Sequence, residues 1–312
     1  MKKQIIVLCS LALLSCEGIS DVEKEVEATK GDKWISEVLE YAPAPGQFIN
    51  GGMGNMEAAK KLVGGKSIVS LGGFGGRIVF RFKNDVENGV GDDFVILGNA
   101  YPDALYPECS SSEPGIVSVS YDENGNGKAD DAWYELRGAN DGDKDVVKDY
   151  EITYLCPSNL TDLANIEWTD NKSGKGTVDV SELEGVNKGP IYPLDEFFTG
   201  GIPKSLTFKG TRIANNGEQT KADLQYWKLH ALGNGYADNY SADYTTMVAG
   251  DSDTKDSNKF DIANAIDENG NSVKLEKITF IKVYSAVFQT CGWLGETSTE
   301  VCGAISLRLQ KK

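Results

Sequence analysis

The sequence is poor in the residues on which many enzymes and nucleic-acid-binding proteins depend. Its 312 residues include one histidine, His230, and 31 Lys and Arg against 47 Asp and Glu. A single histidine excludes the multi-histidine zinc sites of many hydrolases, and we interpret His230 as structural rather than as a catalytic base. The formal net charge of −16 argues against nucleic acid as a partner, because neutralising phosphates requires clustered Lys and Arg.

Apolar runs long enough to span a bilayer are also missing. The apolar stretch near the start, Ile5 to Leu14, is too short to cross a bilayer, which takes ~20 residues. Because it follows two lysines, it predicts a secretory signal peptide over residues 1–15. The signal ends in Leu-Leu-Ser-Cys16, which resembles a bacterial lipobox, and this implies that Cys16 becomes the lipidated first residue. An ordinary signal peptide cleaved near Ser15 or Ser20 is the alternative.

Residues 16–33 are polar and acidic, without a sustained apolar face, and we interpret them as a lipidated tether. Acidic residues soon after Cys16 are similar to the surface-export signals of Bacteroidetes lipoproteins, although Gly18 and Ile19 interrupt the pattern. We therefore expect a protein of the outer membrane, held on the cell surface by its lipid anchor.

Cysteine is scarce as well. Of six cysteines, Cys9 and Cys16 belong to the signal and the lipid site, and four remain in the body of the chain: Cys109, Cys156, Cys291 and Cys302. An even number in an exported chain predicts two disulfides, for which three connectivities exist. We pair Cys291 with Cys302 across a short excursion, and Cys109 with Cys156. A zinc site is disfavoured, because the sequence has no C-x-x-C spacing.

What the sequence does have is many short runs of β-branched and aromatic residues, separated by Gly, Asn, Asp and Pro. Such runs predict strands, and the lack of long helical patterns between them predicts an all-β fold, a β-sandwich or jelly-roll-like domain with long loops and very little helix. The expected strands cover 67–71, 77–82, 94–97, 116–121, 133–136, 150–155, 205–208, 278–284 and 304–309.

We expect helix only at 56–62 and a turn at 195–198. Residues 34–312 read as one domain, with an insertion of long loops around 157–193, where the sequence is polar and weakly periodic. A domain boundary near residue 160 is the alternative.

The clearest chemical motif is a candidate calcium loop at 122–131, D-E-N-G-N-G-K-A-D-D. Oxygen-bearing side chains fall at loop positions 1, 3, 5 and 9, and glycine falls at position 6, as at the start of an EF-hand loop. Position 12 is Trp133 rather than Glu, and strands flank the loop, so we expect a structural calcium ion rather than a sensor. A plain Asx/Gly turn is the alternative. The predicted ligands are Asp122, Asn124, Asn126, Lys128 through its carbonyl, Asp130 and Asp131.

Aromatic residues beside Gly, Asn and Asp suggest a ligand surface, since such residues can stack on flat ligands while amides form hydrogen bonds. Most aromatics of a β-sandwich lie in its core, which is the alternative for each. The candidate ligand-binding residues are Trp133, Tyr236, Asp238, Asn239 and Trp293.

Several segments together resemble an uncharacterised family of Bacteroidetes cell-surface lipoproteins: YAPAPGQFIN at 41–50, SLGGFGG at 70–76, SEPGIVSVS at 112–120, GYADN at 235–239, FDIA at 260–263 and CGWLGETSTE at 291–300. The resemblance implies a secreted or lipid-anchored β protein without an established activity. Similar lipoproteins accompany outer-membrane transporters that import glycans or large cofactors such as corrinoids, which makes such a transporter an expected partner.

Three functions remain open. The first is a surface-anchored lipoprotein that binds a glycan or another nutrient or cofactor and is stabilised by calcium. The second is a structural or adhesive surface protein, which would show a flat apolar patch. The third is a carbohydrate-active hydrolase, which would show two carboxylates roughly 5–9.5 Å apart in a cleft. No residue is assigned a catalytic role.

Overall fold

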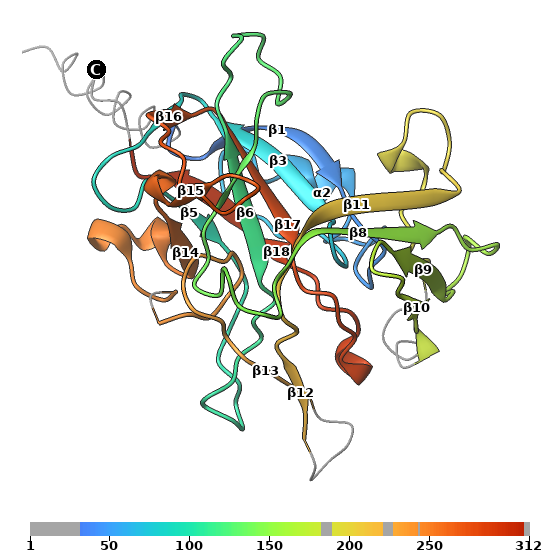
Figure 1. The fold of residues 1–312 in the computed structure, drawn as a ribbon. Coiled ribbons are helices and arrows are strands. Elements are labelled where there is room, and N and C mark those ends of the chain that lie inside the picture. The colour runs from blue at the N-terminus through green and yellow to red at the C-terminus, as the bar shows by residue number, and fades with distance from the viewer. Residues whose placement is uncertain (1–31, 182–188, 221–226, 243, 309–312) are drawn as a thin grey trace, which may run out of the picture.

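The structure, a computed structural model, describes residues 32–181, 189–220, 227–242 and 244–308. The predicted signal peptide, the lipidation site Cys16 and most of the tether lie outside these residues. The fold is all-β, as predicted, with antiparallel sheets connected by long loops (Figure 1). Among the described residues, no helix is both long and apolar enough to cross a membrane.

The central element is a six-stranded antiparallel sheet in the order β1-β3-β17-β6-β7-β15. Its strands are β1 (Ile35–Ala42), β3 (Arg77–Phe82), β17 (Phe280–Ser285), β6 (Gly115–Ser120), β7 (Tyr134–Leu136) and β15 (Ala265–Ile266).

Alternation along these strands gives the six-stranded sheet two different faces. Successive side chains of a strand point to opposite sides, and one set is apolar and buried: Ile78, Phe80, Val117, Val119, Ile281 and Val283. This set packs against a three-stranded sheet of β14 (Ser257–Phe260), β5 (Phe94–Leu97) and β19 (Gly303–Ser306), and the two sheets enclose the main core. The other face carries the charged and polar residues Glu40, Lys282, Ser118 and Glu135, together with Val79 and Ile266.

A four-stranded sheet in the order β10-β9-β8-β11 extends to one side of the central sheet (right in Figure 1). It consists of β8 (Val147–Leu155), β9 (Ile166–Asp170), β10 (Lys175–Val178) and β11 (Ser205–Arg212). The segment 157–193, predicted as long loops, thus contributes β9 and β10. The sequence pattern does not predict these two strands, because β9 and β10 bury few of their residues and their sequences therefore lack clear alternation. The sheet has its own core around Tyr150, Tyr154, Ile166, Tyr192 and Phe208.

Short elements complete the fold. The helix predicted at 56–62 is α2 (Met56–Lys60), and the side chain of Asn55 caps it by accepting a hydrogen bond from the Ala58 N–H. The remaining strands form two-stranded ladders: β2 (Val69–Ser70) with β18 (Glu300–Val301), β4 (Val86–Glu87) with β16 (Lys277–Ile278), and β12 (Gly217–Gln219) with β13 (Trp227–Leu229). The 3-10 turns are η2 (Asp195–Phe197), η3 (Val248–Gly250), η4 (Ser252–Thr254), η5 (Ile262–Asn264) and η6 (Gly292–Leu294).

The two predicted disulfides are not formed, and Cys109, Cys156, Cys291 and Cys302 are free thiols. The reason is that the presumed partners pack in different places. Cys302 packs against Trp34 and its neighbours, whereas the sulfur of its predicted partner, Cys291, lies beside Gly217 on β12. Cys156 packs against the core of the four-stranded sheet. Cys109 lies beside His230, its sulfur 3.7 Å from the imidazole Nδ1. The positions of the four cysteines in the sequence therefore do not predict which of them lie close together in the fold.

Candidate functional site

A cleft of about 860 Å³ lies over the polar face of the six-stranded sheet. Its floor is one row of directly paired residues that crosses all six strands, which we call the floor row. The strand pairing and the alternation of side chains together place these residues side by side on one face. In spatial order the floor row is Glu40, Val79, Lys282, Ser118, Glu135 and Ile266, and all six line the cleft.

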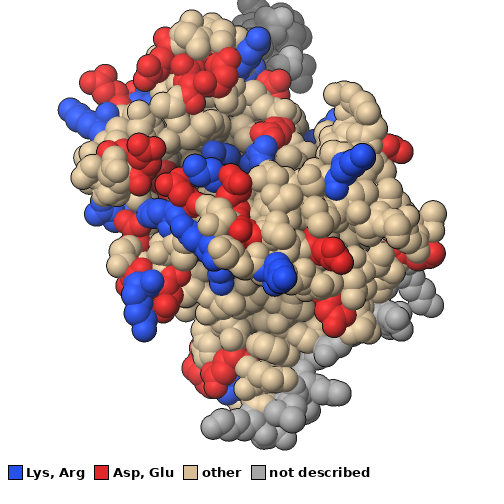
Figure 2. Space-filling view, turned by 45° about the vertical axis from the view of Figure 1, so that its right-hand side comes forward, with Lys and Arg blue, Asp and Glu red and all other residues tan. Residues whose placement is uncertain are grey.

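Charges of both signs line the cleft in equal number. The basic residues are Arg77, Lys128, Lys148, Lys209 and Lys282, and the acidic ones are Glu40, Glu135, Asp149, Asp267 and Glu268. The lining is thus neutral overall, although the chain carries a net charge of −16. The face of the molecule drawn in Figure 2 likewise shows acidic and basic side chains close together rather than a field of one sign.

Most of these charges are already paired within the protein. Arg77 Nη2 lies 2.6 Å from Glu40 Oε1. Glu135 accepts hydrogen bonds from Tyr284 Oη at 2.6 Å, from Thr211 Oγ1 at 2.8 Å and from Lys148 Nζ at 3.2 Å. Glu135 is therefore held in one orientation by three donors, as a preorganised acceptor in a cleft requires.

Lys282 differs from the other cations of the cleft. Its ammonium nitrogen lies 4.3 Å from the centroid of the Trp133 ring, and among the described residues no carboxylate lies within ion-pair range of it. Burial, followed by the charge of Arg77, lowers the pKa of Lys282 to about 8. In Lys148, bonds to Asp141 and Glu135 outweigh the effect of burial and raise the pKa.

A glycine shapes one wall of the cleft. A Cβ added to Gly210 on β11 would lie only 2.8 Å from the Tyr284 ring, closer than real Cβ atoms approach. The bare backbone of Gly210 thus lets Tyr284 reach Glu135 beneath the four-stranded sheet. This contact joins that sheet to the floor of the cleft.

The loop of residues 122–131 forms part of the cleft rim, since Gly127, Lys128 and Ala129 line it. The loop connects β6 with β7 and projects beyond the sheet (Figure 1). Gly125 and Gly127 have positive φ angles of 69° and 73°, the left-handed conformation that favours glycine.

The side chains predicted to bind calcium converge within this loop. Asp122 Oδ1 and Asn124 Oδ1 both accept from the Asn126 N–H, at 3.1 and 3.0 Å. The amide groups of Asn124 and Asn126 approach Asp131 and Asp130, each at 3.2 Å. The backbone N–H of Lys128 donates to Asn126 Oδ1 at 2.7 Å. The predicted ligand residues are therefore neighbours in space as well as in sequence.

The candidate ligand-binding residues separate into different locations. Trp133 lines the cleft, whereas Tyr236, Asp238 and Asn239 are buried and are not among the residues lining it. Their polar groups bond within the protein: Tyr236 Oη accepts from the Asn140 N–H, and Asn239 Oδ1 accepts from the Leu232 N–H. Trp293 belongs to η6, and its side chain lies outside the described part of the structure.

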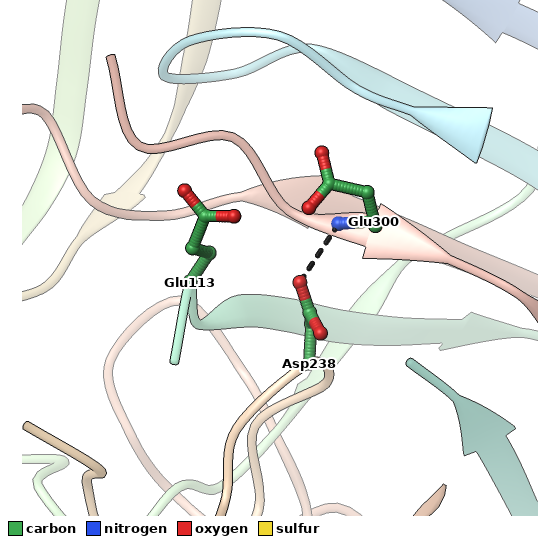
Figure 3. A group of neighbouring side chains, drawn as sticks. All are labelled: Glu113, Asp238 and Glu300. Carbon is green, nitrogen blue, oxygen red and sulfur yellow. Dashed lines mark hydrogen bonds between the residues drawn. The ribbon is translucent and has the colours of Figure 1, made fainter. Parts of the chain in front are cut away.

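Asp238 instead belongs to a group of three carboxylates with Glu113 and Glu300 (Figure 3), of which Asp238 and Glu300 are buried and Glu113 is partly buried. One carboxylate oxygen of each residue lies within 4.8 Å of those of the other two. Asp238 accepts from the backbone N–H groups of Asn99 and Ala100, both at 3.1 Å, and of Glu300 at 3.0 Å. Because these donors are main-chain groups of two separate segments, residues 99–100 and β18, Asp238 ties both segments to its own loop.

These three carboxyl groups resist ionisation. Burial, followed by the charge of Glu300, raises the pKa of both Glu113 and Asp238 well above the ordinary range, and burial also raises the pKa of Glu300. Three carboxylate oxygens at this spacing could surround a cation. The same spacing is also expected when neighbouring carboxyl groups share a proton and so avoid the repulsion between like charges. We treat the triad as a structural element and assign no metal to it.

Cys109, His230 and Glu218 form a second chain of chemically active groups. His230 Nε2 lies 3.0 Å from Glu218 Oε2, and its Nδ1 faces the Cys109 sulfur. Burial, followed by the charge of Glu108, raises the pKa of the Cys109 thiol. A nucleophilic cysteine requires the opposite shift, so this arrangement does not indicate catalysis.

Sequence patterns do not predict most of the cleft. Trp133 and Lys128 were singled out for other reasons, whereas Glu40, Arg77, Glu135 and Lys282 were missed. One signal was present: Lys282 is a charged residue at the centre of an otherwise apolar strand pattern. A search of protein-family models and a search of curated proteins both found no match for this chain.

Proposed function

We propose that this protein is a surface-anchored lipoprotein that binds a glycan, or another nutrient or cofactor, in the cleft over the six-stranded sheet. The observation that carries this proposal is the floor row, in which the charged residues Glu40, Lys282 and Glu135 alternate with the uncharged residues Val79, Ser118 and Ile266 in an open cleft. Small-molecule sites are commonly concave, with volumes of ~300–1,000 Å³ and a few fixed polar groups. The cleft volume of about 860 Å³ falls within that range.

Binding is favoured over hydrolysis by the placement of the two floor-row glutamates. Glu40 and Glu135 lie on β1 and β7, four strand positions apart in the sheet. At a strand spacing of ~4.8 Å their Cα atoms are about 19 Å apart, whereas glycosidase carboxylates lie roughly 5–9.5 Å apart. Each glutamate is also paired with a cation of the protein, as suits an acceptor of ligand hydroxyl groups.

Calcium has a supporting role in this proposal. An ion held by Asp122, Asn124, Asn126, Asp130 and Asp131 would fix the loop whose residues Gly127 to Ala129 form the cleft rim. Support comes from the spacing of the oxygen-bearing residues and from their convergence in the loop. Removing the ion would then loosen the rim and the approach to Trp133.

The proposed location is the outer face of the outer membrane, where Cys16 would carry the lipid. An outer-membrane transporter is the proposed partner, to which a captured ligand would be passed. Support for this comes from the sequence of residues 1–33 and from the resemblance described above.

Isothermal titration against a panel of oligosaccharides and corrinoids tests the proposal. We expect at least one compound to bind, and Trp133→Ala to weaken that binding because Trp133 lines the cleft. Tyr101→Ala removes an aromatic side chain that is 62% exposed and is not among the cleft residues, so it should leave binding unchanged. Flat titrations for the whole panel, or equal binding by the Trp133 variant, would contradict the proposal.

A further inference from the structure

Among the described residues, two cations of the cleft have no ion-pair partner: Lys128 on the rim and Lys282 on the floor. Arg77 pairs with Glu40, Lys148 pairs with Glu135 and Asp141, and Lys209 pairs with Asp149. For Lys282 the described residues provide the Trp133 ring instead. A half-buried ammonium without a counterion is costly, and an anionic ligand group would remove that cost.

Lys282 is half-buried and lines the cleft. Its direct neighbours across the two adjoining strands are Val79 on β3 and Ser118 on β6, whose side chains are short. Lys282 itself lies on β17, third of the six strands, and therefore near the middle of the floor row. A ligand lying across the floor row would meet this ammonium at its centre.

The lining limits how much negative charge a ligand can carry. Five acidic residues line the same cleft, and they would repel a phosphate or a polyanion presented to the Lys282 ammonium. A carboxylate carries one negative charge and matches one ammonium. On either side of Lys282, the Arg77–Glu40 and Lys148–Glu135 pairs offer adjacent donors and acceptors, which suit ring hydroxyl groups.

We propose that the cleft recognises an acidic sugar, a hydroxylated ring whose carboxylate pairs with the Lys282 ammonium beside Trp133. This inference rests on the proposed function and specifies the ligand class of the same site. Lys282 supplies the contact that distinguishes the acid from a neutral sugar. The Arg77–Glu40 and Lys148–Glu135 pairs bind the hydroxyl groups of the acidic and the neutral sugar alike.

The test compares acidic oligosaccharides with their uncharged counterparts of the same shape. Titrations use oligogalacturonate, oligoglucuronate and sialyl-lactose, each beside its methyl ester, with wild-type protein and Lys282→Met. We expect the wild type to bind at least one acid about ten- to a hundred-fold more tightly than its ester, as a charge-assisted hydrogen bond would give. Lys282→Met should lose this preference and keep the weaker binding of the ester.

Two further variants make the result specific. Lys282→Arg keeps the charge and should retain a preference for the acid. Lys61→Met removes the same charge from an exposed position on the turn that follows α2 and should bind as the wild type does. Circular dichroism confirms that each variant is folded.

The outcomes separate this inference from the proposed function. Equal binding of acid and ester by the wild type, or an unchanged preference in Lys282→Met, would overturn the inference while leaving a ligand-binding cleft. The inference would also be overturned if only neutral compounds of the oligosaccharide and corrinoid panel bound tightly. Absence of binding to every compound, charged or neutral, would overturn the proposed function as well.

Discussion

The Lys282 ammonium lies 4.3 Å from the centre of the Trp133 ring, and this contact joins the middle of the sheet to the end of the 122–131 loop. Trp133 follows the loop directly in sequence, whereas Lys282 comes from β17 near the other end of the chain. A cation over an indole ring is attracted by the negative face of the ring. The contact holds the ammonium in the cleft but does not neutralise its charge.

The first prediction concerns stability. The pKa of Lys282 is lower in the folded chain, at about 8, than its ordinary value of 10.5. Below pH 8 the folded chain therefore bears the full cost of the half-buried charge, and above about pH 10.5 it bears none. Lys282→Met should raise the free energy of unfolding by about 1–3 kcal/mol at pH 7. The gain should disappear as the pH rises from 8 to 10.5, as measured by urea unfolding, and a gain that is constant with pH would contradict this.

Binding of an acidic sugar should also depend on pH. An ammonium with a pKa of about 8 is mostly charged at pH 7 and mostly neutral at pH 9. Affinity for the acid should thus fall about ten-fold over this interval, whereas affinity for the methyl ester should stay level. Titrations of both compounds at several pH values check this, and parallel pH profiles for acid and ester would argue against Lys282 as the contact.

Calcium removal gives a third prediction. At a calcium concentration about 100-fold above the dissociation constant, the ion would add about 2.7 kcal/mol to stability, so chelation should lower the melting temperature. Asp122→Ala with Asp130→Ala should abolish the response to chelator. Asp162→Ala, a change in an exposed loop, should keep it. A wild-type melting curve that does not respond to chelator would exclude a calcium ion in the loop.

The carboxylate triad predicts a pH-dependent gain from an isosteric change. Because the pKa of Glu113 is raised in the folded chain, its ionisation costs stability increasingly as the pH rises above about 4.5. Glu113→Gln keeps an acceptor for the Ser298 N–H, which bonds Glu113 Oε1 at 3.2 Å, and it cannot ionise. We expect this variant, measured with chelator present, to match the wild type at pH 4 and to exceed it by about 1–2 kcal/mol at pH 8. A loss of stability at both pH values would show that the carboxyl group is needed as such.

The free thiols provide the fifth prediction. A chain that lacks residues 1–16 should react with four equivalents of a thiol reagent when unfolded without reductant. The folded chain should react more slowly, since Cys109 and Cys291 are buried. If the unfolded chain reacts with fewer than four equivalents of the reagent, at least one of the predicted disulfides is present.

Local features of this fold could be predicted from sequence, and non-local ones could not. The strands at 77–82, 94–97 and 116–121 follow from apolar and β-branched runs, and α2 follows from its helix formers. These signals depend on neighbours in sequence. The 122–131 loop was recognised for the same reason, since its residues are contiguous.

The candidate site depends instead on register between distant strands. Glu40 and Lys282 share the floor row because β1 and β17 both pair with β3, and no pattern within either strand contains that information. The triad is similar, because Glu113, Asp238 and Glu300 come from three separate loops and strands. Asp238 was singled out in the sequence, but its role as an acceptor of three backbone N–H groups needed the folded chain.

The position of β17 has a consequence for how the protein matures. This strand is made late in synthesis, yet it inserts between β3 and β6, which are made early. A growing chain therefore has two unpaired strand edges and no cleft floor until residue 285 is available, and strand pairings so distant in sequence form slowly. Under the proposed function, a chain that ends before residue 285 would lack the cleft floor and could not hold a ligand there.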